Sequence, residues 1–97
     1  MPTLLLALAL LLAPPAYADA ATEQYAPVQL GVARELLERA RARAALGEVV
    51  LAARLAWQAS FDARLAWGMT ESQYLRAEAA EVGGAASTLL SQLAARR

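Results

Sequence analysis

Few of the side chains in this chain could do chemistry. Its 97 residues include no histidine and no cysteine, so the side chain that titrates near neutral pH and the thiol nucleophile are both missing. The serines therefore have no histidine base to activate them. Glu78 and Glu81 share a predicted helix face, but no second carboxylate pair is expected to face them, as a metal site in a helical bundle would need. We predict no catalytic residue, no metal ligand, no cofactor and no small-molecule substrate, and we expect that the protein is not an enzyme.

A different kind of site is indicated by four residues of one predicted helix. Trp57 and Phe61 stand four residues apart, and Arg54 and Arg64 lie near them in sequence. Interfaces between proteins are enriched in aromatic and Arg side chains, so these four residues form a candidate interaction surface. Two other interpretations stay open. Arginine stems or the chain's own third helix could cover the rings, or the rings could line a small-molecule pocket.

The elements that must position these residues are helices. Between residues 27 and 46 apolar side chains recur every three or four residues, which is typical of an amphipathic helix, and Pro27 suits its first turn. Between residues 48 and 67 the same spacing is made almost wholly of alanine, at Val49, Ala52, Ala56, Ala59, Ala63 and Ala66. Gly47 can adopt the left-handed conformation that ends a helix. We therefore expect an antiparallel hairpin of these two segments about Gly47.

The rest of the chain is expected to be helical too, which makes the fold class all-α. Gly68 leaves open whether a third helix begins afresh or the second continues with a kink, over about 71–82. Thr70 and Gln73 fit a capping box at this start. Gly83-Gly84 predicts a break, followed by a short helix over about 85–95. Residues 27–97 would then form a single α-helical domain.

The first eighteen residues predict export. Leu4 to Ala13 is an unbroken run of Leu and Ala, and Ala16 and Ala18 bracket Tyr17 in the small-x-small pattern that signal peptidase cuts after. We expect residues 1–18 to be a signal peptide and 19–26 a polar lead-in. The alternative is a membrane-anchored helical protein that keeps this segment. Against it, ten apolar residues rise only about 15 Å as a helix, half of a hydrocarbon core of about 30 Å.

The net charge of the chain limits which kinds of partner are expected. Nine arginines balance nine acidic residues, so the formal net charge is zero. A neutral chain does not indicate a nucleic-acid partner or a polybasic membrane patch, so a membrane contact is expected only if the N-terminal segment is retained. Since there is no cysteine, we do not expect a lipoprotein.

Residues 21–66 carry a pattern with a family resemblance. It begins with Tyr25-Ala26-Pro27, continues through the turn at Gly47, and ends with Asp62-Ala63 and Leu65-Ala66. Between these elements stand Leu30, Ala33, Leu37, Ala40, Ala53, Ala56 and Ala59. This stretch resembles the bacterial domain-of-unknown-function family 4398. The resemblance implies a small helical protein of the Gram-negative envelope, where family members are often lipoproteins and some carry a peptidoglycan-binding domain.

Two departures from the family pattern bear on function. The family usually has a lipid-accepting Cys after the signal and a further helix before the Tyr-Ala-Pro element, and this chain has neither expected feature. Without that helix, Trp57 and Phe61 have less of their own chain to cover them. We expect an exported scaffold or interaction module of the envelope, in the periplasm, whose partner is a second copy or another envelope protein. The alternative is a periplasmic ligand-binding or chaperone-like helical protein.

Overall fold

The computed structural model describes residues 20–96, and these fold into three helices. They are α2 (Ala20–Ala45), α3 (Val49–Gly68) and α4 (Gln73–Ala95), with no strand among the described residues. The predicted all-α class is confirmed. The predicted signal peptide, residues 1–18 with its cleavage motif at Ala16 and Ala18, lies outside the described residues.

The predicted hairpin of the first two helices is confirmed, and alanine is the reason they fit together. Along α3 the side chains of Ala52, Ala56 and Ala59 are fully buried, and along α2 so are those of Ala33 and Ala40. Because methyl groups take little room, the two helix backbones can approach closely over their whole length. Gly47 closes the turn with a φ of 78°, a left-handed conformation that costs glycine little.

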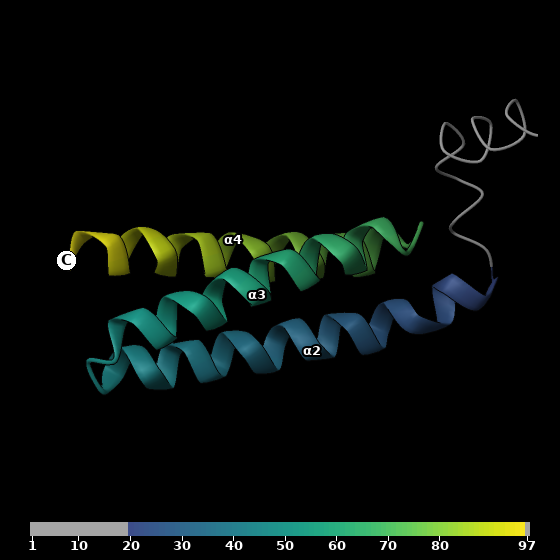
Figure 1. Cartoon of the computed structure of the whole chain (residues 1–97). Helices are drawn as coiled ribbons and strands as arrows, with labels where there is room; N and C mark the ends of the chain where they lie inside the picture. Colours follow the sequence, from purple (N-terminus) through teal and green to yellow (C-terminus); the bar gives the residue numbers. More distant parts are fainter. Residues whose placement is uncertain (1–19, 97) are drawn as a thin grey trace, which may run out of the picture.

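α4 runs back along the hairpin, so that α3 lies between α2 and α4 (Figure 1). Both ends of this arrangement are tied by polar contacts. At one end the Arg96 guanidinium donates to the Ala44 carbonyl oxygen at 3.2 Å. At the other end the Glu23 side chain of α2 accepts hydrogen bonds from Thr70 and Glu71, in the loop between α3 and α4.

The core is a strip between the helices rather than a thick interior. Its larger buried side chains are Leu30, Leu37, Leu55, Val82, Leu89 and Leu93. The remaining buried apolar residues are all alanines. Because these side chains are small, the three helices bury little apolar area and the core stays thin. α3 packs on both neighbours, and its remaining side faces outward.

The start of the first helix differs from the prediction. The segment 19–26 is not a lead-in from Ala20 onward, since α2 begins there and Pro27 lies inside it. A proline inside a helix removes the hydrogen bond to the carbonyl four residues earlier. Ala26 is buried and Glu23 holds the α3–α4 loop, and these tertiary contacts offset that loss.

The predicted break at Gly83-Gly84 is wrong, because α4 is one continuous helix from Gln73 to Ala95. Gly83 sits against α3, where a Cβ on it would lie 3.6 Å from the Cβ of Ala63. Packing along the whole helix outweighs the helix-breaking tendency of two glycines, which is about 1 kcal/mol each.

The start of α4 also answers the question left open at Gly68. α3 ends there, and a new helix begins after a short loop. Its N-cap is Ser72, not Thr70: the Ser72 hydroxyl accepts a hydrogen bond from the Leu75 N–H at 3.3 Å. Thr70 is a fully buried residue of this loop, and its hydroxyl donates to Glu23 instead.

Candidate interaction surface

One side of α3 faces outward and carries large apolar side chains. Trp57 is 63% exposed and Phe61 is 52% exposed, and they form a single ridge with their neighbours one helical turn away. We define the outer face of α3 as Val50, Arg54, Trp57, Phe61, Arg64 and Leu65. All six side chains are exposed, while the opposite side of the same helix supplies seven buried residues.

The exposure of the two rings decides between the earlier interpretations of them. Within the described residues, α4 packs on the buried side of α3 and covers neither ring. The arginine stems do not shield the rings either, since both remain more than half exposed. An account in which the chain's own third helix buries Trp57 and Phe61 is therefore wrong for this part of the chain.

The two arginines of the outer face differ from three of the arginines on α2. Arg34, Arg41 and Arg43 each pair with a glutamate. Arg54 and Arg64 make no ion pair with any described residue.

The only acidic residue of α3 is Asp62, and it lies off the ridge. Asp62 comes one residue after Phe61, hence about 100° round the helix, and its side chain is half-buried. The outer face is therefore apolar along its ridge and positively charged beside it.

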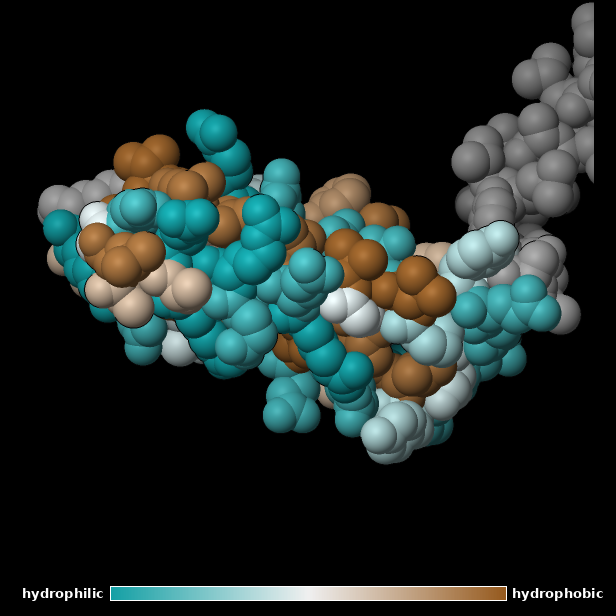
Figure 2. Space-filling view, turned by 90° about the horizontal axis from the view of Figure 1, so that it is seen from below, coloured by the Kyte–Doolittle hydropathy of each residue, from teal (hydrophilic) through white to brown (hydrophobic). Residues whose placement is uncertain are grey.

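Further apolar side chains are exposed on α2 and at the hairpin turn. Seen from the α2 side, hydrophobic atoms gather toward the start of α2 and again toward the hairpin turn (Figure 2). Val28 and Val32 are exposed on α2, and Leu46 and Val50 are exposed around the turn. The apolar surface of the described chain thus extends beyond Trp57 and Phe61.

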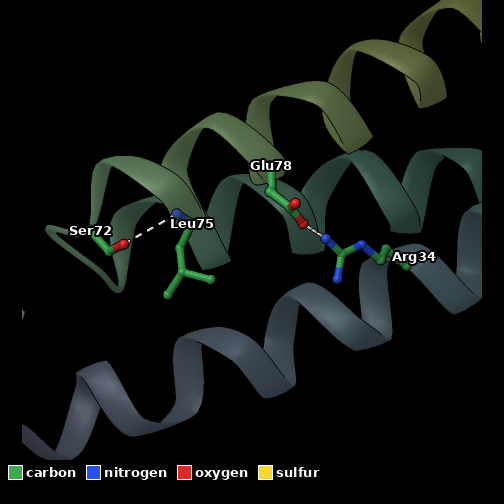
Figure 3. A network of polar contacts seen from close by, with 4 residues as sticks. All are labelled: Arg34, Ser72, Leu75 and Glu78. Atoms are coloured by element: carbon green, nitrogen blue, oxygen red, sulfur yellow. Dashed lines mark hydrogen bonds and ion pairs between the residues drawn. The ribbon is translucent and has the colours of Figure 1, made fainter.

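A groove of about 350 Å³ between α2 and α4 is lined largely by charged residues. Across it the Arg34 guanidinium of α2 points at the Glu78 carboxylate of α4 and forms an ion pair with it (Figure 3). The hairpin register suggests Asp62 as a partner for Arg34, but Glu78 takes that place. The groove's residues are thus largely neutralised by one another, which is what a structural brace requires.

A second groove of about 210 Å³ lies between α3 and α4. Small residues line most of it, together with Arg64 and Trp67. Neither Trp57 nor Phe61 lines either of these two grooves, and both rings are more than half exposed. Among the described residues no group of three or more His, Cys, Asp or Glu side chains is placed to hold a metal ion.

The polar contacts around Thr70 were not predicted from the sequence. Glu23 accepts from the Thr70 hydroxyl at 2.8 Å and from the Glu71 N–H at 2.7 Å, and these two bonds lower the pKa of the Glu23 carboxyl. The Arg76 Nε donates to the Thr70 carbonyl oxygen at 2.8 Å, and its guanidinium lies 4.2 Å from the centre of the Trp67 ring. No local spacing links Glu23 to a loop nearly fifty residues away.

Neither a protein-family model nor a curated protein nor a solved structure matches this chain. The resemblance to family 4398 stays a prediction. None of the described helices is both long enough and apolar enough to cross a bilayer.

Proposed function

We propose that this protein is an exported, non-enzymatic helical module of the bacterial envelope that binds another macromolecule through the outer face of α3. The observation that carries the proposal is the exposure of Trp57 and Phe61, at 63% and 52%, on a helix that is buried along its other side. Large aromatic side chains on an open ridge are what protein interfaces use as anchors.

The non-enzymatic part of the proposal rests on the inventory of side chains. A chain without histidine or cysteine has few routes to a general base or a nucleophile. Glu78 is engaged with Arg34, and Glu23 is engaged with the α3–α4 loop. These contacts give two of the acidic groups a structural task.

Export is supported by the Leu/Ala run and by Ala16 and Ala18. Cleavage after Ala18 would leave α2 intact, since that helix begins at Ala20. The intact mass of the native protein, taken from separated cell fractions, tests this part. A mass matching Asp19–Arg97 in the soluble periplasm supports it, whereas a full-length mass in the membrane fraction would favour an uncleaved anchor.

Binding is tested by site-specific photo-crosslinking in living cells. A photoreactive amino acid at position 61 should give a discrete covalent adduct with a partner. The same amino acid at Gln92, an exposed residue of α4, is the matched control and should give none. Equal patterns at the two positions would contradict the proposal. A smear of many adducts at position 61 alone would favour the chaperone-like alternative.

A further inference from the structure

Arg54 and Arg64 lie on either side of the aromatic part of the outer face of α3. They stand ten residues apart, about 15 Å along the helix, and the rings of Trp57 and Phe61 lie between them in sequence. Both arginine side chains are exposed, and neither has an acidic partner among the described residues.

Any molecule that covers the two rings also removes water from these guanidinium groups. Covering them takes positive charge out of water, which is strongly unfavourable unless an opposite charge replaces the lost hydration. Since α3 offers only the half-buried Asp62 nearby, the carboxylates must come from the partner. A carboxylate can also accept two parallel hydrogen bonds from one guanidinium, which fixes orientation as well as charge.

A second copy of this chain fits the face poorly. In an antiparallel pair centred between Trp57 and Phe61, Arg54 of one copy would face Arg64 of the other. In a parallel pair each of these arginines would face its own counterpart. Both arrangements bring like charges together at the edge of a closing interface, which is unfavourable.

A lipid surface fits less well than a helix. The chain has zero formal net charge, so only the few arginines of one face would attract anionic headgroups. The face is also a single helical ridge, with its two arginines about 15 Å apart along the helix. That shape matches another helix packed alongside α3 better than a broad plane.

We propose that the outer face of α3 binds an amphipathic helix of another protein, with apolar residues on one side and acidic residues about 15 Å apart that pair with Arg54 and Arg64. This inference rests on the proposed function and names the chemistry of its partner. The bound helix would lie along Val50, Trp57, Phe61 and Leu65, so that α3 becomes the centre of a four-helix arrangement.

The test uses three synthetic helical peptides of identical apolar face. They carry two Glu, two Gln or two Lys, spaced ten residues apart. Their binding to the purified protein, in the form recovered from cells, is followed by fluorescence anisotropy of a dye on the peptide. The Glu peptide should bind at least about tenfold more tightly than the Gln peptide, and the difference should shrink at high salt.

Charge reversal supplies the matched variants. Arg54→Glu combined with Arg64→Glu should lower the affinity for the Glu peptide by at least about tenfold. The same double variant should bind the Lys peptide more tightly than the Glu peptide. Arg39→Glu, at an exposed α2 arginine that also makes no ion pair with a described residue, should leave both affinities unchanged. A circular dichroism melt of each variant separates loss of binding from loss of fold.

The outcomes distinguish a failure of this inference from a failure of the proposed function. Equal binding of the Glu and Gln peptides would overturn the acidic partner while leaving the interaction surface in place. Binding of neither peptide would overturn the helical partner, and the crosslinking at position 61 would then judge the function independently. A dimer in sedimentation that depends on Trp57, or tight binding to phosphatidylglycerol vesicles, would replace the proposed partner with a second copy or a lipid surface.

Discussion

The contact between Glu23 and the α3–α4 loop makes stability depend on pH. Hydrogen bonds from the Glu71 N–H and the Thr70 hydroxyl lower the pKa of Glu23 below its ordinary value of about 4.5. A carboxyl group with a lowered folded-state pKa stabilises the fold above its unfolded pKa and loses that contribution as the pH falls through the folded value. The native protein should therefore lose free energy of unfolding below about pH 4.5.

Glu23→Gln removes this titration and tests its assignment. The variant should be less stable than the native protein at neutral pH, and the gap should narrow as the pH falls below about 4.5 and through the lowered pKa of Glu23. Thermal melts across this range measure it. Glu35→Gln, at an exposed residue of the same helix, is the control and should follow the native profile. A Glu23→Gln gap that stays constant with pH would contradict the account.

Trp57 and Phe61 should matter little for folding. Because both side chains are more than half exposed, replacing either with Ala should cost about 1 kcal/mol or less of unfolding free energy. Leu30→Ala, at a side chain only 2% exposed, should cost about 2–5 kcal/mol. Urea denaturation compares the three variants. A large loss at Trp57 would mean that the ring supports the fold and is not reserved for a partner.

Single residues were predictable from the sequence where their role is local. The apolar stripe of α2 and the alanine seam of α3 follow from helical spacing, and the structure buries every alanine of that seam. The partners of Arg34 and Glu23 were not predictable, because they lie on α4 and in the α3–α4 loop. Their positions depend on how the third helix folds back, which no local pattern specifies.

At the scale of the element, the two glycines inside α4 should be replaceable. Gly84 has nothing within 4 Å of an added Cβ, and Gly83 would gain an ordinary contact with Ala63 at 3.6 Å. Gly84→Ala should therefore raise the unfolding free energy by about 0.5–1 kcal/mol. Gly47→Ala should lower it by about 1 kcal/mol, since the residue there has a φ of 78°. Loss of stability in Gly84→Ala would mean that α4 does break there.

The alanine seam should not tolerate a larger side chain. Ala59 is fully buried in α3, where the methyl groups set how closely the hairpin packs. Ala59→Leu should cost about 1–3 kcal/mol through overpacking, measured by thermal melting. Ala77→Leu, at an exposed position of α4, is the control and should be nearly neutral. A neutral Ala59→Leu would show that the helices are held less closely than the structure indicates.

Element types were predictable, but their ends were less so. Periodicity finds a helix, whereas its length depends on what the helix packs against. Pro27 predicts the first turn of a helix and Gly83-Gly84 predicts a break, yet both lie inside continuous helices, because packing against a neighbour overrides the local preference. The start of α4 was predicted wrongly because Thr70 and Ser72 are both residue types that cap helices. Only Ser72 occupies the cap position.

At the scale of the whole molecule, a thin core leaves an outer surface exposed. The three helices bury their alanine-rich faces against one another, yet α3 leaves a ridge of aromatic and aliphatic side chains exposed. The sequence indicated this surface through Trp57, Phe61, Arg54 and Arg64, and the structure adds Val50 and Leu65 to it. The central claim is that a partner covers this ridge in the envelope.

The absence of cysteine from the chain permits a direct measurement of that claim. Gln58→Cys places a thiol beside Trp57 and keeps both rings, and Gln92→Cys provides a thiol at an exposed position of α4. Each variant is treated with a maleimide that cannot cross the inner membrane, in intact cells and after purification. We expect both thiols to react in the purified protein, and only the one at position 92 to react in cells. Equal reaction of both thiols in cells would mean that nothing covers the outer face of α3, and reaction of neither would mean that the protein is not exported.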